Sequence, residues 1–257
     1  MALRYHRRIT APVRRLSRLV VLALLSPALA QSEPTFDIEI NGAADNRVDV
    51  VILGDGYTAE QLDDYAVDAD AIVNKFVAEP PFEEFRNHFN IRRIEVISNE
   101  SGADHPERDE YKDTALGATY NCQGIQRLLC VDYLAVNNVL DASVAPDERD
   151  IILVVVNDPE FGGAGGAFAV ASTHASSADV MMHEIGHSFG YLADEYESSP
   201  PACNTSVEPA AANLTLETDR NLIKWNAGGG PPAGWIELDT IIPYQNGQPT
   251  DVVGLYD

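Results

Sequence analysis

The 257-residue chain has the composition of a globular protein, with 45% hydrophobic and 22% charged residues. Its formal net charge is −23, from 40 acidic and 17 basic residues. This excess of negative charge makes nucleic acid and anionic membrane surfaces poor partners. Two interpretations of the acidic residues are open: a solvated surface, which we favour, or carboxylate clusters that bind Ca²⁺.

Residues 1–30 have the pattern of a secretory signal peptide. Six arginines and no acidic residue precede a short apolar run at 19–25, and Ala28-Leu29-Ala30 supplies the small residues that a signal peptidase reads. No later segment has 18 uninterrupted apolar residues. We therefore expect a secreted or periplasmic protein without a membrane span, the alternative being an N-terminal membrane anchor.

The chain after the signal begins with a linker at 31–35 and then reads as strand, helix and strand. The first strand, at 46–53, ends at a Gly-Asp-Gly turn. Thr58 and Gln61 form a capping box for a helix that we expect to end before Pro80-Pro81. A short helix and a strand at 91–97 follow. This order is typical of an α/β protein with a mixed sheet flanked by helices.

The second half continues this pattern up to a helix that begins at Ser176. We expect a helix at 121–141, a central strand at 150–156, a flexible glycine turn at 162–166 and an edge strand at 167–173. We expect Ser176 to cap the next helix, with Asp179 reaching back.

Few helix signals follow residue 198, where Pro, Gly and Asn are frequent. The sequence thus predicts an α/β part at 31–197 and an irregular C-terminal subdomain at 198–257.

Three cysteines, Cys122, Cys130 and Cys203, complete the composition. In an oxidising compartment, Cys122 and Cys130 are close enough in sequence to form a disulfide. Cys203 is left without a partner. No C-x-x-C pair exists, so we do not expect a zinc site built from cysteines.

The helix after Ser176 contains the motif His183-Glu184-Ile185-Gly186-His187. Residues four apart lie on one face of a helix, so the two imidazoles can bind one zinc ion. Glu184 lies at the rim of that face, where it can take a proton from a zinc-activated water. The alternative is an amphipathic helix whose histidines are only exposed.

A catalytic zinc needs a third protein ligand beyond these two histidines. Gly190 follows His187 by three residues, and we expect it to end the helix with a left-handed turn. Ala193 stands where metzincins place a third histidine, so the acidic residues after it are the candidates. We favour Asp194 over Glu195, although on an unbroken helix Asp194 would lie about 10 Å beyond His187. For both, a surface carboxylate is the alternative.

Several segments together make the chain resemble the M64 family of zinc peptidases, also called the IgA peptidase family. They are HEIGHSFGYLADEY (183–196), ILGDGYT (52–58), SGAD (101–104), CQGIQRLLCVD (122–132) and VGLY (253–256). The resemblance implies a secreted metallopeptidase with a metzincin-like catalytic domain. It also implies zinc on both histidines, glutamate as the base and an acidic third ligand, which fits Asp194.

The sequence departs from the metzincin pattern at the methionine turn expected downstream of the third ligand. Its methionines are Met1, Met181 and Met182, all upstream. Relatives continue past VGLY into a stretch with Cys and Met, so we expect the chain to be truncated, which would also account for unpaired Cys203.

These observations predict a zinc-dependent endopeptidase that acts on a protein or peptide substrate, with Glu184 as general base. We expect the strand at 167–173 to pair with an extended substrate through main-chain hydrogen bonds. The alternatives are a noncatalytic exported binding or adhesion protein that keeps the fold, and a zinc hydrolase of non-peptide amides.

Overall fold

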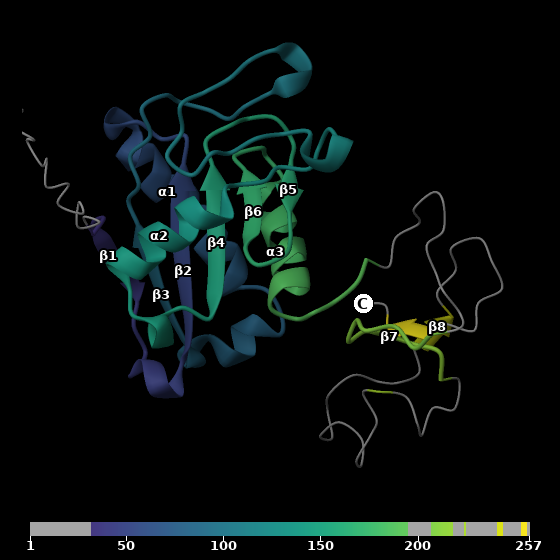
Figure 1. The fold of residues 1–257 in the computed structure, drawn as a ribbon. Helices are drawn as coiled ribbons and strands as arrows, with labels where there is room; N and C mark the ends of the chain where they lie inside the picture. The colour runs from purple at the N-terminus through teal and green to yellow at the C-terminus, as the bar shows by residue number, and fades with distance from the viewer. Residues whose placement is uncertain (1–31, 195–206, 218–223, 225–240, 244–252, 256–257) are drawn as a thin grey trace, which may run out of the picture.

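We describe a computed structural model of the chain, covering residues 32–194, 207–217, 224, 241–243 and 253–255 (Figure 1). The predicted signal peptide, Glu195 and Cys203 lie outside these residues. Within them, no helix is both long and apolar enough to cross a membrane.

A six-stranded mixed sheet forms the centre of the molecule, in the order β1-β3-β2-β4-β6-β5. Strands β3, β2, β4 and β6 are parallel, and both outer strands are antiparallel to their neighbours. The strands are β1 (Thr35–Glu39), β2 (Val48–Asp55), β3 (Phe89–Ile94), β4 (Ile151–Val156), β5 (Gly163–Ala164) and β6 (Ala169–Ser172). The predicted mixed sheet with flanking helices is confirmed.

The sheet is buried on both faces, which explains why its inner strands are continuous apolar runs. Val50 and Ile52 of β2 pack on one face, and Val51 and Leu53 pack on the other. Helices α1 (Leu62–Phe76) and α3 (Ser177–Ser188) cover the first face. Helix α2 (Tyr133–Ser143) covers the second (Figure 1).

Short 3-10 helices connect these elements. They are η1 (Ala44–Asn46), η2 (Ala59–Gln61), η3 (Phe82–His88), η4 (Pro106–Arg108), η5 (Cys122–Gly124) and η6 (Pro146–Glu148). The predicted capping box is present, since the Thr58 N–H donates to Gln61 Oε1 at 3.1 Å. It opens η2, which leads directly into α1.

One strand was missed and one predicted helix was wrong. The expected linker ends at Thr35, where the unpredicted strand β1 begins; β1 pairs with β3 although it carries no strong apolar pattern. The helix expected at 121–141 begins only at Tyr133, where Asp132 accepts hydrogen bonds from the N–H groups of Leu134 and Ala135. Cys122 and Cys130 form a disulfide with their Cα atoms 6.2 Å apart. A helix would hold these atoms about 12 Å apart, so a helix and a disulfide exclude each other here.

The edge of the sheet also differs from the prediction. Residues 162–166 contain strand β5, which is outermost, and β6 lies between β4 and β5. The segment 167–173 is therefore not an edge strand. On the outer side of β5, Gly163 is bridged to Leu128. Among the described residues, Ala164 pairs only with β6.

Asp55, at the end of β2, anchors the loop layer at the carboxyl end of the sheet. Its buried carboxylate accepts hydrogen bonds from Ser98 Oγ (3.1 Å), Thr114 Oγ1 (3.0 Å) and the N–H groups of Leu116 (2.9 Å) and Ala118 (2.8 Å).

Gly56 follows Asp55 with a φ of +71°, and a Cβ atom there would lie 2.2 Å from the carbonyl oxygen of Gly102. The ILGDGYT and SGAD segments therefore meet for structural reasons.

A separate three-stranded sheet has the order β7-β9-β8, with β7 (Leu214–Thr215), β8 (Ile241–Pro243) and β9 (Val253–Leu255). The domain boundary predicted at residue 198 lies outside the described residues.

Candidate metal centre and cleft

Helix α3 begins directly after β6 and carries the predicted motif. Its N-cap residue is Ser176, but the Ser176 side chain makes no capping hydrogen bond. Asp179 does not reach back, because its carboxylate lies 3.0 Å from Lys75 Nζ of α1. The helix is instead held by buried Met181 and Ile185, which pack in the core with α1 and the sheet.

His183, His187 and Asp194 each direct one atom toward a common point. The two Nε2 atoms are 3.1 Å apart, and Asp194 Oδ1 lies 3.0 Å from His183 Nε2 and 3.2 Å from His187 Nε2. A tetrahedral zinc ion with bonds of 2.0–2.1 Å holds its ligand atoms about 3.3 Å apart. Asp194 Oδ1 is buried and accepts no hydrogen bond in the described part of the chain. These atoms therefore fit a small divalent cation.

The orientation of His187 is set by a hydrogen bond at its other ring nitrogen. His187 Nδ1 lies 2.7 Å from the carbonyl oxygen of Leu192. A carbonyl can only accept, so Nδ1 carries the proton and the lone pair is on Nε2. The chain that follows the helix thus prepares His187 for a metal, as such outer contacts commonly do.

The turn that returns the chain to the metal centre differs in one detail from the prediction. The left-handed residue is Tyr191, with a φ of +54°, and not Gly190. Gly190 is needed for a close approach, because a Cβ atom there would lie 2.8 Å from the Gly186 carbonyl oxygen. The break brings Asp194 back to the histidines.

Asn213 holds the segment that carries Asp194. Its Oδ1 accepts from the Ala193 N–H at 2.8 Å, and its Nδ2 donates to the Ala193 carbonyl at 2.9 Å. This contact joins positions 20 residues apart, and nothing in the sequence pattern marked Asn213.

Glu184 is 7% exposed and lines the cleft beside the two histidines. Burial raises the pKa of its carboxyl above the usual value of 4.5, and the neighbouring imidazoles of His183 and His187 oppose this shift. No other described residue donates a hydrogen bond to the Glu184 carboxylate. The group is thus a buried acceptor with capacity left for a ligand.

The cleft in front of these groups has a volume of about 470 Å³. A second hollow of about 530 Å³ adjoins it and shares Arg127, His183 and Glu184. The cleft is lined by Ile125, Arg127, Leu128, Gly163, Ala164, Gly165, Gly166, His183, Glu184, His187 and Asp194. One wall is thus the loop closed by the disulfide, and the other is β5 with its glycines.

The glycines of 162–166 allow β5 to approach α3. A Cβ atom at Gly163 would lie 2.5 Å from Val180 Cγ1, and one at Gly165 would lie 2.8 Å from both Glu184 Oε2 and His187 Cβ. This run was predicted to be a flexible turn, and its close contact with α3 was not predicted. Arg127 was also missed, although its charge acts on Glu184 across the cleft.

The remaining histidines take different places. His174 lines neither hollow, and its Nδ1 accepts from the Ser176 N–H at 3.2 Å. His105 is 4% exposed and lies 2.9 Å from Asp158 Oδ2. Among the described residues, both clusters suited to a metal contain a histidine, which favours zinc over the calcium that the acidic composition suggested.

An open cleft with three convergent ligand atoms and a buried carboxylate is typical of a metal-dependent hydrolase. A sequence model of the family described as IgA Peptidase M64 matches residues 37–239, so the chain belongs to this peptidase family. No match was found among curated proteins. The predicted family is confirmed, and with it the expectation of a peptidase.

Proposed function

We propose that the chain is an exported zinc endopeptidase with a metzincin-like site, in which His183, His187 and Asp194 hold the metal and Glu184 is the general base. The observation that carries this proposal is the convergence of three ligand atoms, 3.0–3.2 Å apart, beside a buried glutamate in an open cleft. When bound there, zinc supplies a Lewis acid that polarises the scissile carbonyl and lowers the pKa of water.

Glu184 moves the proton in this mechanism. Its carboxylate takes a proton from the attacking water and returns it to the leaving amine when the C–N bond breaks. Burial supports this role, because a carboxyl with a raised pKa is a better proton acceptor than an exposed glutamate. The imidazoles of His183 and His187 oppose this rise in the pKa of Glu184.

The substrate binds as an extended strand along Ala164–Gly166 in place of the predicted 167–173 segment. Ala164 ends β5, the outermost strand of the sheet, and Gly165 and Gly166 follow it. All three line the cleft that contains His183 and Glu184. Main-chain hydrogen bonds at such an edge hold peptides with little dependence on their sequence. The two adjoining hollows leave room for substrate on either side of the scissile bond.

Export rests on the pattern of residues 1–30 and on the disulfide. Cys122 and Cys130 are joined, and such bonds form in oxidising compartments. Amino-terminal sequencing of the protein recovered outside the cytoplasm tests the proposed cleavage after Ala30. An intact amino terminus in that fraction would contradict it.

Cleavage of casein and of a quenched peptide library tests the activity. We expect Glu184→Gln to lower kcat/KM by about 10²–10⁴-fold at unchanged zinc content. Glu60→Gln, at an exposed glutamate of η2, is the matched control and should leave the rate unchanged. A chelator should abolish cleavage, and added zinc should restore it.

The outcomes separate the alternatives. Wild-type cleavage rates in Glu184→Gln would refute the general base. A wild-type protein that binds zinc but cleaves no peptide would favour the noncatalytic binding protein.

A further inference from the structure

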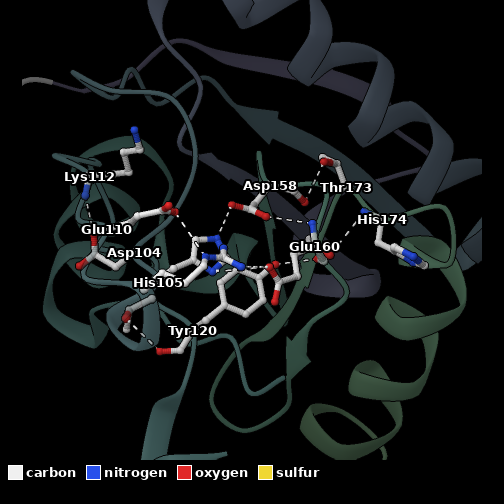
Figure 2. A network of polar contacts seen from close by, with 12 residues as sticks. Asp104, His105, Glu110, Lys112, Tyr120, Asp158, Glu160, Thr173 and His174 are labelled. Atoms are coloured by element: carbon white, nitrogen blue, oxygen red, sulfur yellow. Dashed lines mark hydrogen bonds and ion pairs between the residues drawn. The ribbon is translucent and has the colours of Figure 1, made fainter. Parts of the chain in front are cut away.

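A second histidine–carboxylate cluster lies in the loop layer at the carboxyl end of β4 (Figure 2), and none of its residues lines the cleft. His105 is 4% exposed, and its ring stacks on Tyr120 with centroids 4.4 Å apart. Asp158 and Glu160 follow β4, and Glu107 lies in η4. Segments more than 50 residues apart thus meet at one buried imidazole.

The contacts of His105 indicate which tautomer a neutral ring adopts. Its Nε2 lies 2.9 Å from Asp158 Oδ2, and an ionised carboxylate only accepts, so Nε2 carries a proton. In a neutral imidazole the lone pair is then on Nδ1. That atom faces Glu107 Oε1 at 3.4 Å and Glu160 Oε2 at 3.8 Å. It is buried and makes no hydrogen bond within the described ranges.

Three electron-rich atoms thus face one another: His105 Nδ1, a Glu107 oxygen and a Glu160 oxygen, all within 4.8 Å. We propose that they form a second divalent metal site, separate from the one on α3. A cation among them would remove their mutual repulsion. An imidazole with two carboxylates favours zinc over calcium or magnesium, and Asp158 would orient the imidazole from behind, as outer-shell carboxylates commonly do.

Arg108 balances the charge of this cluster in the metal-free chain. Its Nη1 lies 2.6 Å from Glu160 Oε2, the oxygen that would bind the metal, and its side chain is 42% exposed. It also approaches Glu110 and Glu107, at 3.4 Å and 3.8 Å. The guanidinium can move into solvent when a cation takes that oxygen. Arg108 and the metal therefore compete for Glu160.

A metal at this site would fasten two loops to each other. Glu107 belongs to the 104–110 loop, and Glu160 stands three residues before β5. The Glu160 carbonyl already accepts from Tyr120 Oη at 2.7 Å. The role is structural: it stabilises the segment that leads into the edge strand, and it does not depend on the proposed peptidase activity.

Zinc binding by the full chain carrying His183→Ala and His187→Ala tests the proposal, because the α3 site is then removed. After zinc loading and buffer exchange, we expect one zinc per chain by mass spectrometry. At zinc roughly a hundredfold above Kd, Tm should rise by about 5 °C or more.

Further changes in that background locate the ion. Glu107→Gln with Glu160→Gln should abolish both the bound zinc and the Tm shift. The Glu107 and Glu160 side chains are 24% and 32% exposed, and glutamine has the same size and shape as glutamate, so these changes should preserve the loop. Replacing the buried His105 could unfold it. Glu83→Gln with Glu84→Gln, at two exposed positions of η3, is the matched control and should retain the zinc.

Arg108→Gln should tighten zinc binding about tenfold by calorimetry, since it removes the competing charge. Loss of all zinc in the protein without His183 and His187 would overturn the proposal. So would zinc retention after Glu107 and Glu160 are replaced. If Arg108→Gln leaves the zinc affinity unchanged, Glu160 is not a ligand, and the proposed site is wrong as well.

Discussion

Asp55 and Glu184 are both buried acidic residues, and they differ in what surrounds the carboxylate. Asp55 accepts hydrogen bonds from four donors, at 2.8–3.1 Å, which tie β2 to the loop layer. Glu184 lies in a cleft wall and accepts none from the described residues. A buried carboxylate with its acceptor capacity filled stabilises the fold, whereas one with capacity left open is available for chemistry.

Asp55→Asn should give the largest loss of stability. One carboxylate oxygen becomes an NH₂ group that faces donors, so buried N–H or O–H groups lose their acceptor. We expect the free energy of unfolding to fall by about 3 kcal/mol or more, measured by urea denaturation. Asp70→Asn, at an exposed position of α1, should change it little. If Asp55→Asn unfolds at the same urea concentration as the wild type, the hydrogen bonds to Asp55 do not contribute to stability.

The disulfide closes the loop that lines one wall of the cleft, so its removal should affect both stability and substrate binding. Replacing Cys122 and Cys130 by serine frees a loop of nine residues, which lowers stability by about 2–3 kcal/mol. The same loop carries Arg127 and Leu128 in the cleft wall, so KM for peptides should rise. Reducing agent should reproduce both changes in the wild type and have no effect on the serine variant. An unchanged KM would show that the loop does not contribute to substrate binding.

Glu184→Gln should act on stability in the opposite direction to Asp55→Asn. Because burial raises the pKa of Glu184 in the folded chain, the ionised form weakens folding. In chelator-treated protein the wild type and Glu184→Gln should match below about pH 4.5, the usual value for glutamate. As the pH rises through the folded pKa, the wild type loses stability that the variant keeps, by no more than a few degrees in Tm. A wild type that gains stability relative to the variant over this range would contradict the comparison.

Tyr191→Gly should produce the smallest effect. Tyr191 is 75% exposed with a φ of +54°, so its side chain adds little packing in a strained backbone conformation. Glycine relieves that strain but has more freedom in the unfolded chain, so we expect a gain of at most about 1 kcal/mol. Tyr111→Gly, at an exposed tyrosine outside the left-handed region, should not stabilise the protein. If Tyr191→Gly lowers the free energy of unfolding as much as Tyr111→Gly does, the backbone at Tyr191 is not strained.

The parts predicted from the sequence are those with local causes. The apolar run at Asp150–Val156 indicated the central strand, and the capping box at Thr58 marked the start of the first helix. Spacing alone placed His183 and His187 on one face, and the need for a third ligand pointed to Asp194. The structure brings these three together because the helix ends before Tyr191.

The parts missed depend on contacts between distant segments. Strand β5 is two residues long and rich in glycine, so strand propensity does not predict it. It forms because it pairs with β6 and because its glycines allow a close approach to α3. The buried position of His105 comes from Asp158, 53 residues later. Asn213 likewise acts on a residue 20 positions away, and only folding brings the two together.

The hydrogen bonds between Asn213 and Ala193 mean that the two halves of the proposed α3 metal centre are held in different ways. The histidines belong to a packed helix, whereas Asp194 lies in the segment after it, where the Asn213 side chain hydrogen-bonds the main chain of Ala193. If these residues hold the proposed zinc ion, its release would begin at the Asp194 carboxylate, with the imidazole pair left in place. The lifetime of the loaded centre is therefore open to adjustment from a position that never touches the ion.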